Sequence, residues 1–371
     1  MIKPLIIEPR DPMIFRDGKP FTAGAGARSL PFAPPSVIAG AMRTRLGSPN
    51  GRPFDKSKIS ALLEVEFAGP VLGYRKSDAP SWGLAFAAPA DYLSYEREGM
   101  NPAKQVALRC VEEEGGCDLP EGLRRLEGAA DRKVSSEMPV FWSWDSMSEW
   151  LTKKERNGFL PNGWGKLKRQ RRVHVSMSTE FQTAVEGMLY STEGLEFHGT
   201  REEATEFSLI AWYDCGKHQD LAAVNVPRVS HLGGESRTAF WDAKANEPGQ
   251  PKCPIGEPPK GFRMILATPA VFEGGWKPGW LDAGNEGAPP GFEGKLKVRL
   301  NAAAVPRALP ISGWDYKLEE AKPTRLMVPA GSVYFFDVMG SGDARELWMR
   351  SVCDVAQDRL DGFGRVLIGE A

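Results

Sequence analysis

The sequence has few cysteines and no pairing pattern among them. Their number is five, which is odd, and no Cys-x-x-Cys motif occurs. They are Cys110, Cys117, Cys215, Cys253 and Cys353. A disulfide framework is therefore not expected, and a reducing compartment is favoured. Cys215 and His218 form half of a zinc pattern, but no second pair at suitable spacing completes it, so we expect no metal and no cofactor.

Long apolar runs are also missing. No stretch of about 18 consecutive apolar residues occurs, so no segment is expected to cross a membrane. Near the start, Pro4, Glu8, Arg10 and Asp11 interrupt the apolar run that a secretory signal peptide needs. These absences predict a soluble, cytoplasmic protein.

The chain has no excess of positive charge and few histidines. Its 47 Lys and Arg residues are balanced by 48 Asp and Glu residues, which gives a formal net charge of −1. Any binding of nucleic acid must therefore depend on local basic patches rather than on a global positive field. Only four histidines occur, and the first of them is His174.

What is present predicts a globular protein with many turns. The chain has 371 residues, and 42% of them are hydrophobic, enough for a sizeable core and a prior of roughly two domains. Forty glycines and 30 prolines predict many turns and long loops. A polar stretch over 96–131 predicts an insertion, and the Pro, Asn and Gly residues of 160–165 mark the best domain boundary.

Apolar periodicity predicts three helices and a larger number of strands. Ser36 is the expected N-cap of the first helix, with Ile38, Met42 and Leu46 one turn apart and Gly47 at C′. A capping box opens a second helix over 146–158, and a third is expected over 343–358. The expected strands cover 5–7, 62–73, 82–89, 173–177, 207–213, 262–268, 296–300, 333–338 and 366–368.

The last ten residues carry a glycine loop before the final strand. Gly362 and Gly364 flank Phe363, and Arg365 follows. Glycine lets the backbone approach a ligand closely, while the ring could stack on a base and the guanidinium could pair with a phosphate. The alternative is a tight turn that enters an edge strand, because a lone Gly-x-Gly is a weak signal.

Three other features favour contact with a polyanion. Gly233 and Gly234 form a second glycine loop, with Arg237 three residues on. The basic run 166–172 leads into a strand that contains His174; the alternatives are a solvated loop and a hydrogen-bonded strand histidine. Arg43 and Arg45 leave the apolar stripe of the first helix, whose start offers free N–H groups; the alternative is an amphipathic helix with solvated arginines.

Motifs spread along the chain resemble those of one known family. In the first half they include Pro9-Arg10-Asp11-Pro12 and Pro34-Pro35-Ser36-Val37-Ile38, and in the second half Leu232-Gly233-Gly234-Glu235-Ser236-Arg237. Ile311-Ser312-Gly313-Trp314-Asp315, Lys322-Pro323-Thr324-Arg325 and the terminal glycine loop follow. Together they resemble the family of the third subunit of the type III-B CRISPR effector, the Cmr complex, within the RAMP superfamily.

The resemblance implies an α+β fold of two ferredoxin-like, RNA-recognition-like domains. The first would cover 1–165, with a large insertion at about 91–165, and the second 166–371. It implies a non-catalytic subunit that binds the 5′ tag of the guide RNA. Its neighbours would be the large polymerase-like subunit and the backbone RAMP subunits. The element order along the chain suits a split βαβ fold as well.

The residues expected to contact RNA come from the features above. They are Arg28, Ser36, Arg43, Arg45, Arg172, His174, Gly233, Gly234, Arg237, Lys322, Arg325, Gly362, Phe363, Gly364 and Arg365.

Three other functions remain open at this point. A RAMP-type endoribonuclease that processes precursor guide RNA usually carries a histidine near its first helix as general base, and none occurs here. A cyclase or polymerase needs paired carboxylates for two metal ions, whereas residues 340–343 supply only Asp343. A purely architectural subunit would use the glycine loops as tight turns.

Overall fold

The chain forms two compact units built from interleaved segments. The structure is a computed structural model, and it describes residues 2–18, 28–48, 52–76, 79–96, 104–111, 118–128, 133–135, 137–153, 155–198, 205–222, 229–242, 248–315 and 317–371. Unit 1 contains Met1–Trp82, Leu167–Gly249 and Leu309–Leu326, and unit 2 contains Gly83–Lys166, Gln250–Ala308 and Met327–Ala371. The division into domains 1–165 and 166–371 stays a prediction.

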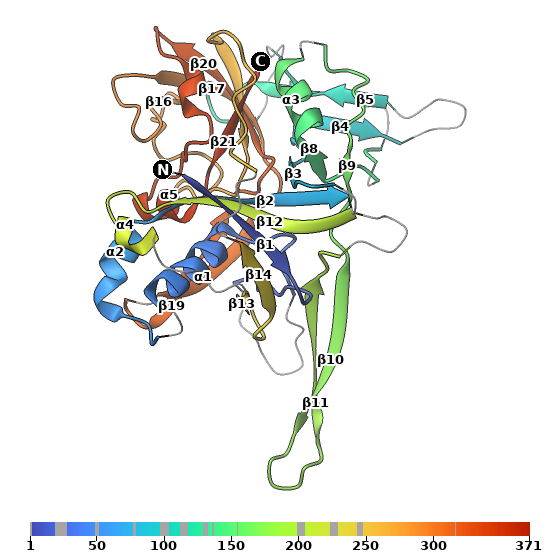
Figure 1. Cartoon of the computed structure of the whole chain (residues 1–371). Coiled ribbons are helices and arrows are strands. Elements are labelled where there is room, and N and C mark those ends of the chain that lie inside the picture. The colour runs from blue at the N-terminus through green and yellow to red at the C-terminus, as the bar shows by residue number, and fades with distance from the viewer. Residues whose placement is uncertain are drawn as a thin grey trace. The chain divides into compact units, whose positions relative to one another are not determined.

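Unit 1 is organised around an antiparallel sheet (Figure 1). Its strands lie in the order β13 (Val229–His231), β14 (Thr238–Asp242), β1 (Lys3–Pro9), β12 (Thr205–Asp214) and β2 (Glu66–Lys76). Each neighbouring pair is antiparallel. The run Leu5, Ile6 and Ile7 is buried, which confirms the first expected strand and places it in the middle of this sheet.

The first helix begins two residues earlier than its sequence predicts. Helix α1 covers Pro35–Gly47 and is preceded by Pro34, so Ser36 is not its N-cap. Proline suits the first helical position because its missing N–H has no partner to lose. Gly47 is the last helical residue, not C′, and a Cβ there would lie 2.3 Å from the Phe54 ring. The other helices of unit 1 are short: η2 (Lys56–Lys58), α2 (Ile59–Leu63) and α4 (Gln219–Ala222).

Two hairpins complete unit 1. β10 (Arg169–Met177) and β11 (Ala184–Leu195) form a two-stranded antiparallel ribbon, drawn in green, that extends away from β1 and β12 (Figure 1). We call this ribbon the arm. The strand begins at Arg169, so part of the basic run belongs to the arm rather than to a loop. The second hairpin consists of β18 (Leu309–Asp315) and β19 (Glu320–Met327).

Unit 2 contains a second antiparallel sheet. Its strands lie in the order β16 (Glu286–Gly287), β17 (Lys297–Ala304), β20 (Val333–Met339), β15 (Gly261–Leu266) and β21 (Val366–Glu370). Along β17, Val298 and Leu300 are buried while Lys297 and Arg299 are exposed, which confirms the alternation of that strand. The final strand lies at the sheet edge.

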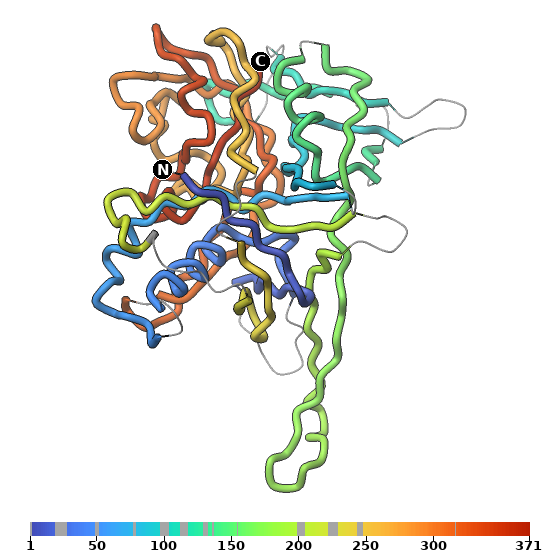
Figure 2. The backbone as a smooth tube through the Cα atoms, viewed as in Figure 1, coloured from blue at the N-terminus to red at the C-terminus, as the bar shows by residue number. Residues whose placement is uncertain are grey.

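Residues 83–166 also belong to unit 2, beside the segments coloured orange and red in Figure 2. They form β3 (Gly83–Ala87), β4 (Tyr92–Tyr95), β5 (Lys104–Ala107), β6 (Arg109–Val111), β7 (Arg125–Glu127), β8 (Phe141–Ser143), α3 (Trp144–Thr152) and β9 (Gly163–Trp164). The capping box at Ser146 is wrong, because Ser143 caps α3 and its hydroxyl accepts from the Ser146 N–H.

The helix expected over 343–358 is wrong. The chain instead forms a short 3-10 helix, η3 (Ala344–Leu347), and then helix α5 (Ala356–Asp361). Between them the backbone pairs with the terminal segment: the Met349 N–H donates to the Val366 carbonyl at 2.8 Å and the Val352 N–H to the Gly364 carbonyl at 3.0 Å. Tertiary pairing therefore overrides the helical stripe that the sequence shows.

Candidate nucleic-acid interface

The arm has two chemically different faces. Residues directly opposite each other in an antiparallel pair point to the same side of the ribbon. His174 lies opposite Tyr190, and Arg172 lies opposite Thr192, so these four side chains share one face. The His174 and Tyr190 rings stack with centroids 5.0 Å apart, and His174 Nε2 lies 2.8 Å from the Thr192 hydroxyl. This is the polar face of the arm.

The sequence alone does not identify Tyr190 and Thr192 as residues of the candidate interface. Each is an unremarkable strand residue until the register of the arm is known. The only indication of a hairpin in the sequence is a pair of alternating runs separated by a short turn. The bulge between Val175 and Met177 makes the exact pairing of the two strands hard to predict. A hairpin interpretation of residues 169–195 predicts the ribbon but not the pairing of Tyr190 with His174, because the register shifts between Val175 and Met177.

The base of the arm is basic and exposed. Arg171 and Arg172 are exposed, and Arg172 Nε donates to Gln170 at 2.7 Å. Arg169 forms an ion pair with Glu193 and also donates to the Ser29 carbonyl at 3.1 Å. The positive charge is therefore only partly neutralised, and it stands where a polyanion can reach it.

The arm and the Gly233 loop attach to one short segment of unit 1, residues 13–18. Met13 pairs with Leu195 of β11, with hydrogen bonds of 2.9 and 2.7 Å. The next carbonyl, that of Ile14, accepts from the Gly234 N–H at 2.8 Å. The arm and the Gly233 loop, which are about 40 to 60 residues apart in the sequence, thus bond to consecutive residues of the 13–18 segment. This segment holds the two features next to each other.

The same segment holds two further features. The Phe15 carbonyl accepts from the Leu30 N–H at 2.7 Å, which fixes the chain next to exposed Arg28. The Gly18 carbonyl accepts from the Thr324 hydroxyl at 3.1 Å, one residue before Arg325. Four of the sequence-predicted cations of unit 1, Arg28, Arg172, Arg237 and Arg325, therefore come from chain segments that meet at residues 13–18.

Asp11 connects two of the predicted arginines. Its carboxylate accepts from both the backbone N–H and the hydroxyl of Thr238, at 2.8 and 2.7 Å. These hydrogen bonds hold the pKa of Asp11 below its ordinary value, and the positive charges of Arg237 and Arg172 lower it further. One carboxylate thus lies in the field of two guanidinium groups.

The Gly233 loop is shaped by backbone packing. Gly233 has φ +72°, and a Cβ there would lie 2.6 Å from the Ile14 carbonyl oxygen, so only glycine fits. The Gly234 N–H is already used by Ile14, so it is not the phosphate donor that the sequence suggested. Arg237 is partly exposed, and its buried Nε has no hydrogen-bond partner within the described residues.

Lys322 and Arg325 lie on β19, and both are partly exposed. The Lys322 carbonyl accepts from the Ser312 hydroxyl at 2.9 Å, which ties the two strands of the second hairpin. Trp314 of the same hairpin is 55% exposed. Ser36 lies in the first turn of α1 and is partly exposed. The role of these three predicted residues in RNA binding stays a prediction.

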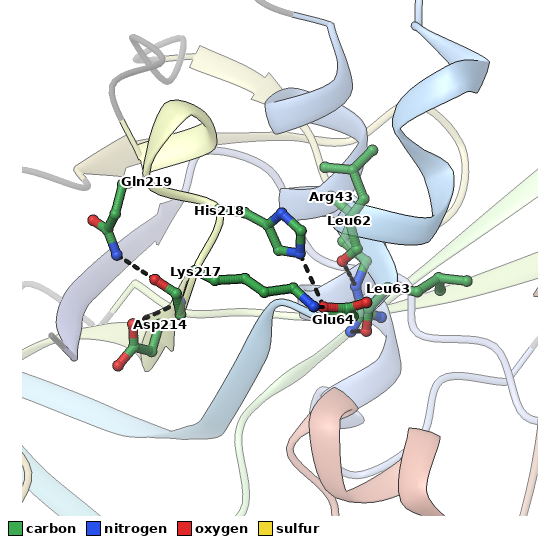
Figure 3. Close-up of polar contacts among 9 residues, drawn as sticks. Arg43, Leu62, Leu63, Glu64, Asp214, Lys217, His218 and Gln219 are labelled. Carbon is green, nitrogen blue, oxygen red and sulfur yellow. Dashed lines mark hydrogen bonds and ion pairs between the residues drawn. The ribbon is translucent and has the colours of Figure 1, made fainter.

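Arg43 is not solvated, as Figure 3 shows. It is buried, and its guanidinium donates to the carbonyls of Leu62 (2.8 Å), Leu63 (3.4 Å) and Val65 (3.0 Å). Beside it, Glu64 accepts from Lys217 and His218 at 2.8 and 2.9 Å. The arginine therefore serves as a cap for the end of α2 and as a connection between α1 and β2.

Arg45 is buried as well. Its guanidinium lies 3.6 Å from the centre of the Trp241 ring and donates to the His231 carbonyl at 2.6 Å. Burial lowers the pKa of Arg45 to about 10. Arg43 and Arg45 are thus both part of the core of unit 1. Their position fits neither solvated arginines on an amphipathic helix nor direct contact with RNA.

The terminal glycine loop is inside unit 2, with Phe363 0% and Arg365 4% exposed. Gly362 has φ +97° and caps α5. Every N–H of the loop has an internal acceptor: Gly362 donates to Arg359, Phe363 to Asp358, Gly364 to Pro269 and Arg365 to the Thr268 hydroxyl. These residues are therefore outside the interface, because the ring and the guanidinium are buried and no backbone N–H is left for a nucleotide.

Two titratable residues that the sequence singled out are engaged in ion pairs within the chain. His218 is engaged by Glu64, and Asp343 by Arg345, which lowers the pKa of that carboxyl. Within the ranges given above, no three His, Cys, Asp or Glu side chains gather closely enough to hold a metal ion. In the same part of the chain, no helix has the length and apolar composition needed to cross a membrane.

No curated protein matches the sequence. Two solved structures of the type III-B Cmr-beta bound to cognate target RNA, one of them with AMPPnP, contain a chain that is 16% identical, with TM-scores of 0.47 and 0.48. Each match covers 90% of this chain and 86% of that one. A chain of the Csm3-Csm4 subcomplex of the type III-A CRISPR-Cas interference complex is 10% identical over 92% of this chain and 94% of that one, with a TM-score of 0.37.

A protein-family comparison is more decisive than these distant structures. The family described as "CRISPR-associated protein (Cas_Cmr3)" matches residues 5–371. This range includes the arm, the Gly233 loop and both sheets. The chain therefore belongs to the Cas_Cmr3 family of CRISPR-associated proteins.

Proposed function

We propose that this type III-B effector subunit holds the 5′ tag of the guide RNA without acting on it chemically. The observation that carries the proposal is the meeting of exposed cations at residues 13–18 beside the polar face of the arm. Arg172, Arg28 and Arg237 would neutralise phosphates, and the stacked His174 and Tyr190 rings offer a surface for an unstacked base. Phosphate contacts of this kind fix register without reading sequence.

The strand order of each unit supports a ferredoxin-like, RNA-recognition-like fold. In unit 1, β1, β2, β12 and β14 are the first to the fourth strand of the motif in sequence order. Across the sheet they lie in the order β14, β1, β12, β2, and α1 and α4 are the two crossover helices. In unit 2, β15, β17, β20 and β21 lie in the same order. There α5 precedes the fourth strand, while an irregular segment replaces the first helix.

We propose a non-catalytic role, which the polar contacts of unit 1 support. His174 is stacked and hydrogen-bonded on a strand of the arm, His231 Nδ1 lies 3.0 Å from the Ser236 carbonyl in the Gly233 loop, and α1 carries no histidine. We propose that the large polymerase-like subunit and the backbone subunits are the neighbours of this chain, and that cleavage and polymerisation belong to other subunits. Incubation of the purified chain with repeat RNA should leave the RNA intact.

Crosslinking within the assembled complex tests the proposal. A guide RNA with 4-thiouridine placed in its 5′ tag is irradiated, and the adducts are mapped by mass spectrometry. The expected adducts lie on peptides of the arm base and the Gly233 loop. Adducts confined to residues 359–368, or an absence of adducts on this chain, would reject the tag-holding role; cut repeat RNA in the incubation would favour an endoribonuclease.

A further inference from the structure

Asp11 lies between the start of β14 and the base of the arm. The residue before it, Arg10, donates its N–H to the Thr238 carbonyl at 2.9 Å. The residue after it, Pro12, packs so closely against Gly194 of β11 that a Cβ on that glycine would lie 2.9 Å from the Pro12 Cβ. The chain at Asp11 is therefore held against both β14 and the arm.

Each of these two features carries one of the predicted arginines. Arg237 directly precedes Thr238, and Arg172 lies opposite Thr192 of the arm, two positions from the glycine that packs on Pro12. Among the described residues, the hydrogen bonds to the Asp11 carboxylate come from Thr238 alone. The carboxylate therefore acts on both guanidinium groups through its field and not as a direct partner.

Other carboxylates of this part of unit 1 are placed differently. Glu193 of the arm forms an ion pair with Arg169. Glu235 of the Gly233 loop is exposed, and Asp17 lies six residues further along the chain. Asp11 differs from them because two hydrogen bonds fix its negative charge beside the cations that the RNA would use.

We propose that Asp11 sets the affinity of unit 1 for the tag RNA through two opposite effects. Its hydrogen bonds to Thr238 hold the adjacent Arg237 in position, which favours binding. Its negative charge weakens the attraction of Arg172 and Arg237 for phosphates, which opposes binding. Asp11 is thus a positioning residue that limits how strongly any RNA is held. The inference rests on the proposed function, because it concerns the same cations.

Asp11→Asn separates the charge from the hydrogen bonds. Both bonds end on Oδ2, and an amide oxygen can accept two hydrogen bonds as well. We expect the full-length variant to bind a single-stranded RNA of the tag sequence about three- to tenfold more tightly at low salt, with its melting temperature unchanged. The gain should shrink between about 0.05 and 0.3 M salt. An unrelated RNA of equal length should gain as much, since phosphate contacts carry no sequence information.

Glu64→Gln is the matched control, because it removes the same charge at the other end of the sheet. Glu64 bonds to Lys217, just beyond β12, at the end where Tyr213 pairs with Lys3 of β1 (Figure 3). Asp11 lies past the opposite end of β1, whose seven residues span about 20 Å. This separation exceeds the Debye length of about 10 Å at 0.1 M salt, so the control should bind RNA as the native chain does. An equal gain in both variants would overturn the inference.

Asp11→Ala removes the charge and the acceptor together. We expect it to bind at least about threefold more weakly than Asp11→Asn and to melt at a lower temperature, because Thr238 loses its partner. Equal affinities of these two variants would contradict the positioning effect. If Asp11→Asn fails to tighten binding while Arg172→Ala weakens it, the inference is overturned and the proposed function stands. If Arg172→Ala changes nothing either, both fail.

Discussion

Arg365 of the terminal loop and Arg172 of the arm carry the same guanidinium in opposite surroundings. Arg365 is 4% exposed and donates to the carbonyls of Met349 and Arg359, at 3.1 and 3.2 Å. Arg172 is exposed on a strand of the arm, and its Nε donates to the amide oxygen of Gln170. The first holds the end of the chain in place, and the second keeps its charge available for an anion.

The difference shows that a glycine loop followed by an arginine has two physical meanings. In unit 2, the loop uses its glycines for a helix cap and a turn, and its N–H groups are all spent on protein acceptors. In unit 1, Gly233 lets the loop approach Ile14, and its arginine remains partly exposed near Asp11. Burial, rather than the motif, separates structural cations from those that stay accessible to an anion.

The largest effect is expected where a buried arginine loses its counter-ion. Arg263 and Asp91 are 0% and 1% exposed and form an ion pair of 2.6 Å, while Asp91 also accepts from Trp150. Asp91→Ala should lower the free energy of unfolding by about 3–5 kcal/mol, because it leaves a buried charge without its partner. Urea unfolding followed by tryptophan fluorescence measures this change.

A partly exposed ion pair provides the control for that variant. Glu286 bonds to Lys297 and Arg299 on the surface of unit 2, and Glu286→Ala should cost much less than Asp91→Ala. Equal losses for the two variants would mean that burial does not distinguish structural from surface arginines in this protein.

A smaller effect separates two neighbouring glycines of the unit 1 loop. Gly233→Ala should destabilise by about 1–3 kcal/mol, because its φ of +72° and its contact with the Ile14 carbonyl leave no room for a Cβ. Gly234→Ala should change the stability by less than about 1 kcal/mol, since a Cβ there would meet its nearest atom at 3.5 Å. Thermal unfolding followed by circular dichroism compares them, and matching melting temperatures would contradict the packing account of this loop.

The smallest effect is expected at Glu64, on the surface of unit 1. The hydrogen bonds from Lys217 and His218 hold the pKa of Glu64 below its ordinary value. A carboxylate of this kind adds stability above the pKa of an unfolded glutamate, and that contribution is lost as the pH falls through the folded value. Melting temperatures should therefore drop slightly more on acidification for the native chain than for Glu64→Gln. Parallel curves from neutral pH to about pH 3 would show that the contact contributes nothing.

Local patterns predicted strands well and the surroundings of cations poorly. The alternation of Val298 and Leu300 with charged residues is enough to place β17, because one face of a strand must be buried. Residues 343–358 show a helical stripe, yet their backbone forms hydrogen bonds with the terminal segment. Local helix propensity does not predict such pairing with another segment of the chain. No residue near Arg45 in the sequence predicts its contact with the Trp241 ring, since the two residues belong to elements nearly 200 positions apart.

The affinity of tag RNA for Arg172→Ala and Arg365→Ala, measured by filter binding at several salt concentrations, tests the central claim most directly. Arg172→Ala should weaken binding and reduce the slope of log affinity against log salt by about one, with the melting temperature unchanged. Arg365→Ala should lower the melting temperature and leave the affinity of the folded fraction as it was. If folded Arg365→Ala loses RNA while Arg172→Ala binds as the native chain does, the assignment of the interface to the arm is contradicted.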